Sequence, residues 1–220
     1  MPPPFDLLPP LLGGLVVTLQ LTAGGACVAL VLSFAGGLGR LARNAPLRAL
    51  AGLYIEVFRG TSALVQLFWV YFVLPFFGVD IDAMTAGILV LGLNIGAYGS
   101  EVVRGAIQAV PSGQYEAATA LNLSRARTIW RIAIPQALPA MIPPAGNLLI
   151  ELLKTTALVS LIAISELTFV AQTLRADTLR TAEIFSLVLL VYFGVAMVLA
   201  YGMRTLEHRL SRWRHPGGYR

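Results

Sequence analysis

Long apolar runs separated by short polar stretches dominate the chain. Four of them are long enough to cross about 30 Å of hydrocarbon, which takes roughly 20 helical residues. A fifth run, at 62–78, is shorter and strongly aromatic. The pattern predicts an all-α membrane protein with about five transmembrane helices in a single domain over residues 1–220. The four longer runs lie near residues 14–38, 83–103, 147–171 and 184–204.

Composition supports residence in a cell membrane as a multi-pass protein. Of the 220 residues, 57% are hydrophobic and 12% are charged, and the mean hydropathy is +0.76. A soluble domain carries about 25% charged residues. The net charge of +5 raises the question of nucleic acid binding. However, the basic residues lie in short stretches beside apolar runs and form no basic stripe, which argues against a nucleic-acid partner.

The placement of the basic residues predicts the orientation of the chain. The stretches 40–60 and 104–154, together with the C-terminal tail, hold 14 of the 16 lysines and arginines. On the opposite side lie only Arg175 and Arg180. Since cytoplasmic loops carry an excess of basic residues, we expect the N-terminus outside and the C-terminus in the cytoplasm.

Two of the predicted spans carry small residues at every fourth position. Such ridges let helix backbones approach closely in lipid, where no hydrophobic effect drives helix association. We favour packing within the chain over a seam between two copies. The ridge residues are Gly25, Ala29, Ser33 and Gly37 in the first span, and Gly92, Gly96 and Ser100 in the third.

The stretch at about 104–146 is too polar to span the membrane, and we expect it on the cytoplasmic side. Ser112 is able to cap a short helix over 114–121, and Glu116 is favourably placed near the positive end of that helix. Asn122 is expected to end the helix, because asparagine tolerates left-handed backbone.

A second short helix is predicted from about 125 to 134, with Ser124 as its cap. Arg127 and Arg131 are four residues apart and therefore share a face of this helix. The prolines that follow are expected to steer the chain back toward the membrane. They are Pro135, Pro139, Pro143 and Pro144.

Together these signals predict a helix–turn–helix elbow on the cytoplasmic face. Ala117 and Ala118 follow Glu116, and such small residues allow another surface to come close. From the pattern alone two interpretations remain open: a docking site for a soluble partner, or an amphipathic loop with solvated charges.

The elbow sequence resembles the EAA loop of ATP-binding-cassette (ABC) importer permeases. Three further stretches, 54–61, 94–98 and 154–158, resemble the polar amino-acid branch of that family, and the resemblance runs from about Gly14 to Gln172. One departure is Asn122, which stands where the family usually has glycine. The stretches 58–68 and 120–123 look like those of ectoine and hydroxyectoine permeases. The elbow segment reads Glu116-Ala117-Ala118-Thr119-Ala120-Leu121-Asn122-Leu123-Ser124, followed by Ile129 and Ile134-Pro135.

The resemblance implies a type I importer permease fold and a set of partners. In that family the loop forms coupling helices that sit in a cleft of an ATPase dimer, two permeases pair, and a solute-binding protein delivers the substrate outside the cell. The resemblance therefore implies a permease subunit that forms part of a translocation pathway for a polar amino acid or a similar compatible solute.

No catalytic, cofactor or metal site is expected in the chain. A nucleotide-binding loop needs glycines followed by lysine, and the only lysine, Lys154, has no glycine run before it. Cys27 is isolated in an apolar run, and His208 and His215 lie in the tail without a carboxylate pair. We therefore expect a subunit that is not an enzyme. The alternatives are an autonomous secondary transporter and a membrane-embedded enzyme.

Charged and polar residues within the spans are candidates for the pathway, because a charge at mid-bilayer costs about 2.5–3.5 kcal/mol on insertion scales. Glu151 and Lys154 are three apart and are also able to pair with each other. Glu166 is expected near the outer end of the same helix. A polar seam of Asn94, Tyr98 and Glu101 is expected either to line the pathway or to form hydrogen bonds between helices.

The C-terminal stretch 205–213 reads as a short basic helix with an aromatic residue. Basic residues beside a membrane span are attracted to anionic lipid headgroups. We therefore expect membrane lipid as a further contact of the chain.

Overall fold

The computed structural model describes residues 5–211, and within this range the regular structure is entirely helical. Four long helices make up most of it. Shorter helices connect them: α2 (Ala45–Gly60), α3 (Ala63–Phe68), α5 (Ser112–Ala120), α6 (Arg125–Thr128) and α8 (Leu167–Thr178). The long helices are α1 (Leu8–Arg40), α4 (Ala83–Gln108), α7 (Ile134–Thr155) and α9 (Thr181–Ser211).

Membrane-spanning capacity agrees with the prediction of about five spans. Four helical segments in the described chain are long and apolar enough to cross a bilayer. A fifth span is formed if the helical stretches Ala45–Gly60 and Ala63–Phe77, which are bent by 105° at residues 61–62, count as one. The segment 40–60, which we expected to be a loop, is therefore largely the helix α2. Pro46 in its first turn fits a helix start, because the N–H that proline lacks has no partner there anyway.

The predicted span 147–171 has the wrong bounds. The helix α7 already begins at Ile134 and ends at Thr155, where a 3₁₀ turn (Thr156–Ile162) follows. Ala163 is left-handed with φ 61°, so the chain turns there before α8 begins. Three prolines that we expected in a connecting loop lie inside α7: Pro139, Pro143 and Pro144. Membrane helices tolerate prolines where neighbouring groups satisfy the freed carbonyls.

The small-residue ridges bring α1 and α4 together, as predicted. A Cβ added at Gly92 would lie 2.6 Å from Cβ of Val28, and one added at Gly96 would lie 3.3 Å from Cα of Ala29. Real Cβ atoms do not approach a neighbouring side chain as closely as the first of these distances. The small residues therefore serve packing within the chain.

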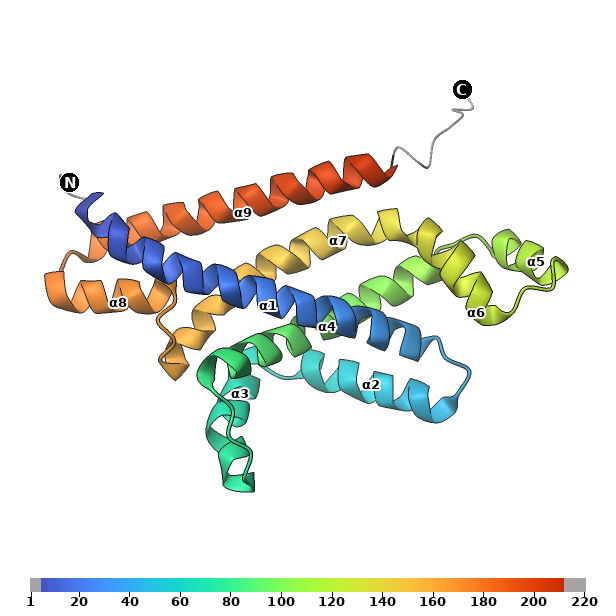
Figure 1. The fold of residues 1–220 in the computed structure, drawn as a ribbon, viewed down its shortest axis with the longest axis horizontal. Coiled ribbons are helices and arrows are strands. Elements are labelled where there is room, and N and C mark those ends of the chain that lie inside the picture. The colour runs from blue at the N-terminus through green and yellow to red at the C-terminus, as the bar shows by residue number, and fades with distance from the viewer. Residues whose placement is uncertain (1–4, 212–220) are drawn as a thin grey trace.

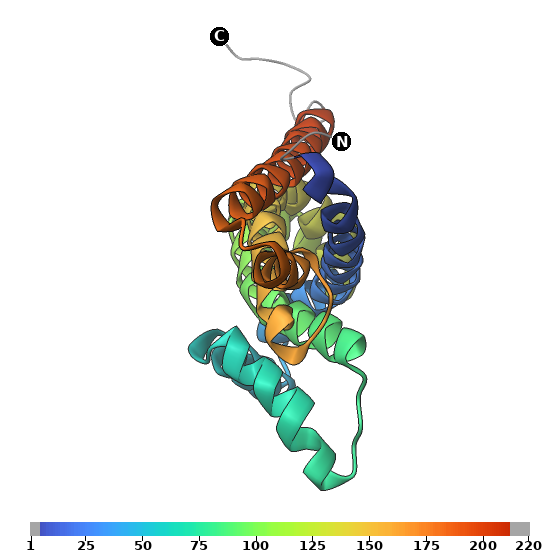
Figure 2. The ribbon, with the colours of Figure 1, turned by 90° about the vertical axis from the view of Figure 1, so that its left-hand side faces the viewer.

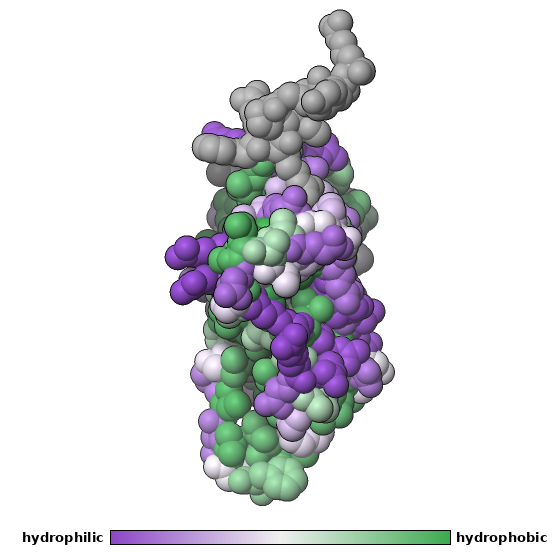
Figure 3. All heavy atoms as spheres, turned by 90° about the vertical axis from the view of Figure 1, so that its right-hand side faces the viewer, coloured by the Kyte–Doolittle hydropathy of each residue, from purple (hydrophilic) through white to green (hydrophobic). Residues whose placement is uncertain are grey.

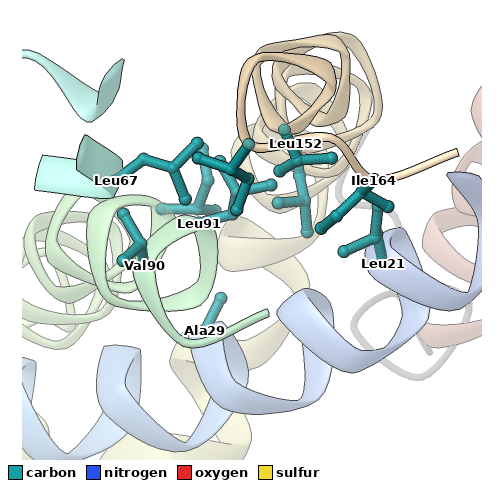
Figure 4. Packing of buried hydrophobic residues seen from close by; sticks show 10 residues of the cluster. Leu21, Ala29, Leu67, Val90, Leu91, Leu152 and Ile164 are labelled. Carbon is teal, nitrogen blue, oxygen red and sulfur yellow. The ribbon is translucent and has the colours of Figure 1, made fainter. Parts of the chain in front are cut away.

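A buried hydrophobic cluster forms the centre of the bundle. Leu21 of α1, Leu91 of α4 and Leu152 of α7 are at most 1% exposed. Leu67 of α3 and Ile164 of the loop before α8 belong to the same cluster. Figure 4 shows these side chains converging from five segments that are far apart in the sequence. This cluster holds the bend between α2 and α3 against the long helices.

The long helices lie side by side, with the N-terminal end of α1 at one end of the molecule and α5 and α6 at the other (Figure 1). The stretch that contains α3 projects away from the bundle (Figure 2). Hydrophilic residues gather at the end that carries α5 and α6 (Figure 3). By contrast, the long helices present apolar side chains outward, such as Val31 and Val198, which are 68% and 71% exposed. The outward apolar side chains suit contact with lipid.

Candidate coupling elbow and polar seam

The elbow is a tight connection between α5 and α6. Asn122 is left-handed with φ 53°, as its type predicted. Its amide N–H donates to the carbonyl of Thr119 at 2.9 Å, and the N–H of Leu123 donates to the carbonyl of Ala118 at 3.0 Å. These bonds satisfy carbonyls that the end of a helix leaves free. Ser124 caps α6, as predicted, with its hydroxyl accepting from the N–H of Arg127 at 3.4 Å.

Two local expectations for the elbow are wrong. Ser112 is not a cap but the first residue of α5, because Pro111, with ψ 138°, already holds the extended backbone of a cap position. The second helix is not a regular helix over 125–134. It continues from α6 through a π-helical turn (Ile129–Ala133) directly into α7. The continuous helix that contains α7 therefore begins at Arg125, so the connection from the end of α4 is 109–124 and lies within the expected stretch 104–146.

The outer surface of the elbow carries most of the predicted docking residues. Glu116 and Ala117 are exposed, as are Arg127 and Arg131. Ala118 is only 1% exposed, so of the two small residues only Ala117 is open to another surface. An exposed Leu121 adds apolar surface at the tip. Asn122, Ser124 and Pro135 are exposed as well.

Three side-chain hydrogen bonds fasten the elbow to the bundle. The hydroxyl of Tyr115 donates to the carbonyl of Ile107 at 2.8 Å, and partial burial raises the pKa of that hydroxyl. Arg125 donates to the carbonyl of Leu41 at 2.7 Å. The amides of Gln136 and Gln114 are joined at 3.1 Å. These bonds connect the elbow to α4, to the end of α1 and to α7.

The polar seam on α4 binds the bend between α2 and α3. Asn94 is 8% exposed, and its side-chain amide donates to the carbonyl of Phe58 at 2.9 Å and to Gln66 at 3.2 Å. Gln66 in turn donates to the hydroxyl of Thr61 at 2.7 Å. Gln66 was not predicted as a partner of the seam. The available signal was a lone amide within the aromatic run 62–78.

The rest of the seam is paired with basic residues. The guanidinium of Arg59 lies over the ring of Tyr98, 5.1 Å from its centroid. Glu101 accepts from Arg104, one turn further along α4, at 3.0 Å and 2.5 Å. Tyr98 and Glu101 are partly exposed, unlike Asn94 at the buried end of the seam. Arg59 was also not predicted as a contact of the seam, although it is a basic residue three positions before the aromatic run 62–78.

The other charged candidates are separated from this seam. Glu151 and Lys154 are exposed on α7, and the described residues contain no ion pair between them. Glu166 does not lie on the same helix as Glu151 and Lys154, because the helical segment ends at Ile162 and the chain turns at Ala163. It is fully buried and caps α8 by accepting from the N–H of Phe169 at 2.8 Å. The hydroxyls of Tyr192 and Thr18 donate to the same carboxylate at 3.1 Å and 3.4 Å.

The expected basic helix at 205–213 is partly visible. Residues 205–211 continue α9 without a break. Trp213, the aromatic residue on which part of that interpretation depended, lies outside the described residues.

Residues 29–212 match the family described as the inner membrane component of binding-protein-dependent transport systems. The chain belongs to this family. It is 50% identical over 215 residues to the probable amino-acid ABC transporter permease y4tF of Sinorhizobium fredii, covering 95% of this chain and 90% of that protein. It is 37% identical over 209 residues to the glutamine transport system permease GlnP of Escherichia coli, covering 94% and 95%.

Solved structures support the same assignment for this inner membrane component. A chain of an amino acid ABC transporter crystallised with histidines superposes with a TM-score of 0.85 at 35% identity, covering 93% of this chain and 95% of the other. The inward-facing MetNI methionine ABC transporter gives a TM-score of 0.79 at 20% identity, covering 96% and 99%, and supports the fold alone. The chain therefore has the type I importer fold. It is a multi-pass membrane subunit that is not itself an ATPase.

Proposed function

We propose that this permease imports a polar amino acid or an amino-acid-like compatible solute, and that its elbow couples the pathway to a separate ATPase dimer. The observation that carries the coupling role is the elbow itself. It is a short, tightly closed turn that exposes Glu116, Ala117 and two arginines, at the hydrophilic end of an otherwise apolar bundle. Its hydrogen bonds to the ends of the long helices provide a route for mechanical coupling.

The proposed arrangement has the N-terminus outside and the elbow in the cytoplasm. Residues 1–220 form one permease domain, which pairs with a second permease, identical or homologous. The chain is similar to two permeases of one organism, y4tF at 50% and y4tG at 37% identity, which supports such a pair. A solute-binding protein outside the cell delivers the substrate, as the family description implies.

The proposed pathway passes the partly exposed end of the seam on α4, where Tyr98 and Glu101 lie, and the exposed Glu151 and Lys154 on α7. Mixed charges and an aromatic ring suit a zwitterionic solute. Relatives named for glutamine, cystine and octopine transport support an amino-acid substrate. The stretches 58–68 and 120–123, which resemble ectoine permeases, support ectoine or hydroxyectoine as the narrower candidates. Glu166 is assigned a supporting role, since its carboxylate is buried as a helix cap.

A pull-down with charge reversal tests the coupling role. The chain is expressed with its neighbouring ATPase and permease genes, purified by a tag on this subunit, and assayed for ATP hydrolysis and for uptake into proteoliposomes. Glu116→Lys should lower ATPase recovery and uptake while the permease still inserts. Asp177→Lys is the matched control, because Asp177 is an exposed carboxylate on α8, at the end of the molecule opposite the elbow (Figure 1).

Normal recovery and uptake with Glu116→Lys would refute the docking role. Uptake by this chain alone, without ATP, would instead indicate an autonomous secondary transporter. The solute class is identified by competition: uptake of labelled ectoine is measured with an excess of unlabelled glutamine or cystine. Inhibition by these amino acids would indicate an amino-acid permease, whereas ectoine uptake that no amino acid inhibits would favour ectoine or hydroxyectoine.

A further inference from the structure

A long apolar groove lies between α1, α4, α7 and α9. Its volume is about 470 Å³, and its α7 wall runs from Leu138 to Leu152. At the rise of about 1.5 Å per helical residue, that wall is roughly 21 Å long. Leu149, Ile95 and Leu30 line it from three of the helices, and Met203 and Leu206 line it from α9. The groove is separate from the polar seam, and the proposed function does not use it.

The groove exists because α1 and α9 meet at one end only. At the end away from the elbow they are joined through the buried Leu11, Leu167 and Ile184, and through the carboxylate of Glu166. Toward the elbow the two helices diverge (Figure 1), and α7 lies between them. The space left by this divergence is open on the side that faces the surroundings of the bundle, since Leu30 is 61% exposed.

The chemistry of the groove excludes a polar solute. Its one polar side chain is Ser33, whose hydroxyl already donates to the carbonyl of Ala29 at 2.6 Å. Every other lining side chain among the described residues is aliphatic, aromatic, thioether or absent. Water gains too few hydrogen bonds in such a space, and an empty one forfeits dispersion contacts. In a bilayer the occupant must therefore be hydrocarbon.

The dimensions favour a narrow occupant over a whole helix of a partner protein. The groove is a narrow slot, with a volume of about 470 Å³ along a wall of roughly 21 Å. A whole α-helix, about 10–12 Å in diameter with its side chains, does not fit inside such a slot. A single extended hydrocarbon chain is narrow enough. Next to the elbow end of the groove, α9 carries the exposed Arg204 and Arg209, which attract an anionic headgroup.

We propose that this groove holds one acyl chain of an anionic phospholipid, with the headgroup beside Arg204 and Arg209. The chain fills the space between the diverging halves of α1 and α9 and so supports the same ends of α4 and α7 that hold the elbow. Bound lipid is thus a structural component of the permease, whatever solute it carries.

Lipid retention by the purified full-length chain tests the proposal. The chain is mixed in detergent with phosphatidylglycerol or phosphatidylcholine, and bound lipid is counted by native mass spectrometry. The wild type should retain one phosphatidylglycerol per chain. Ala145→Phe, which adds a ring at an exposed alanine lining the groove, should lower retention by about tenfold. Val198→Phe, on the outer face of α9, is the matched control and should retain lipid normally.

Two further measurements keep the test decisive if Ala145→Phe folds poorly. Arg204→Gln combined with Arg209→Gln should abolish the preference for phosphatidylglycerol over phosphatidylcholine. A phosphatidylglycerol with a photoactivatable acyl chain should label Met203 and Leu206 in the wild type. Equal retention by Ala145→Phe and Val198→Phe would overturn the proposal. So would labelling spread evenly over the outer faces of the helices, or a cross-link from Leu30 to a second copy of the chain.

Discussion

The left-handed residue at the tip of the elbow gives a sharp test of how coupling depends on backbone geometry. Asn122 has φ 53° and closes the turn between α5 and α6 through the bond from its N–H to Thr119. Valine at this position keeps the amide N–H but places a branched Cβ against the backbone in the left-handed region. Glycine relieves the same contact.

The expected effect of Asn122→Val on affinity or stability follows from the free-energy cost of left-handed backbone at this position. Left-handed backbone costs about 1–2 kcal/mol for a residue with a Cβ, and asparagine pays less than valine because its side chain bonds locally. If the free elbow relaxes in Asn122→Val, docking must restore the turn, and affinity for the ATPase falls by about 5- to 30-fold. The hydrogen bonds from Tyr115 and Arg125 could instead hold the turn closed in the free permease. In that case the conformational cost of valine lowers the free energy of unfolding of the permease, and affinity for the ATPase stays the same.

The assay therefore measures both the affinity for the ATPase and the thermal stability of the permease. The ATPase is titrated onto permease in lipid nanodiscs to obtain the half-saturating concentration, and thermal unfolding is followed on the same samples. Ala120→Val is the control, because it adds the same side chain at an exposed helical position of the same elbow. Asn122→Gly should bind at least as tightly as the wild type. Unchanged affinity together with unchanged stability in Asn122→Val would refute the reasoning.

Three further predictions concern the bundle. Gly96→Ala should destabilise the permease by about 1–3 kcal/mol, because its Cβ would lie 2.8 Å from Leu32. Gly105→Ala, in the same helix with open space around it, should be stabilising, so equal unfolding temperatures for the two variants would contradict the close α1–α4 contact. Glu166→Ala should cost about 1–3 kcal/mol by leaving buried donors unpaired, and Glu166→Gln less, as measured by thermal unfolding. Arg180 donates to Asp6 at 2.7 Å and lowers the pKa of that carboxyl. The stabilisation is therefore present above the ordinary aspartate pKa and lost as pH falls through the lowered value, so Asp6→Asn should differ from the wild type at neutral pH and converge with it in acid.

Local chemistry made parts of the elbow predictable. The left-handed Asn122 and the cap at Ser124 depend only on residues within a few positions, so the residue types were sufficient to predict both features. The prediction for Ser112 was wrong because Pro111 occupies the cap position instead. The local sequence allows either residue to be the cap and does not show which of them is preferred. Likewise, the burial of Ala118 beside an exposed Ala117 depends on what lies behind the helix, which no local signal records.

The long apolar runs and the small-residue ridges determined that this is a helical membrane protein and which faces of α1 and α4 meet, because lipid forces helices to satisfy their own backbone and to associate through close packing. The sequence did not determine that the chain bends between α2 and α3, how Asn94 and Gln66 bind that bend, or that Glu166 caps a separate helix. The contacts that hold the bend and bury Glu166 join residues dozens of positions apart, as Asn94 with Gln66 and Glu166 with Tyr192 and Thr18. They depend on the angles between helices, including the divergence of α1 and α9 that leaves the groove, and such angles follow from the whole bundle packing at once.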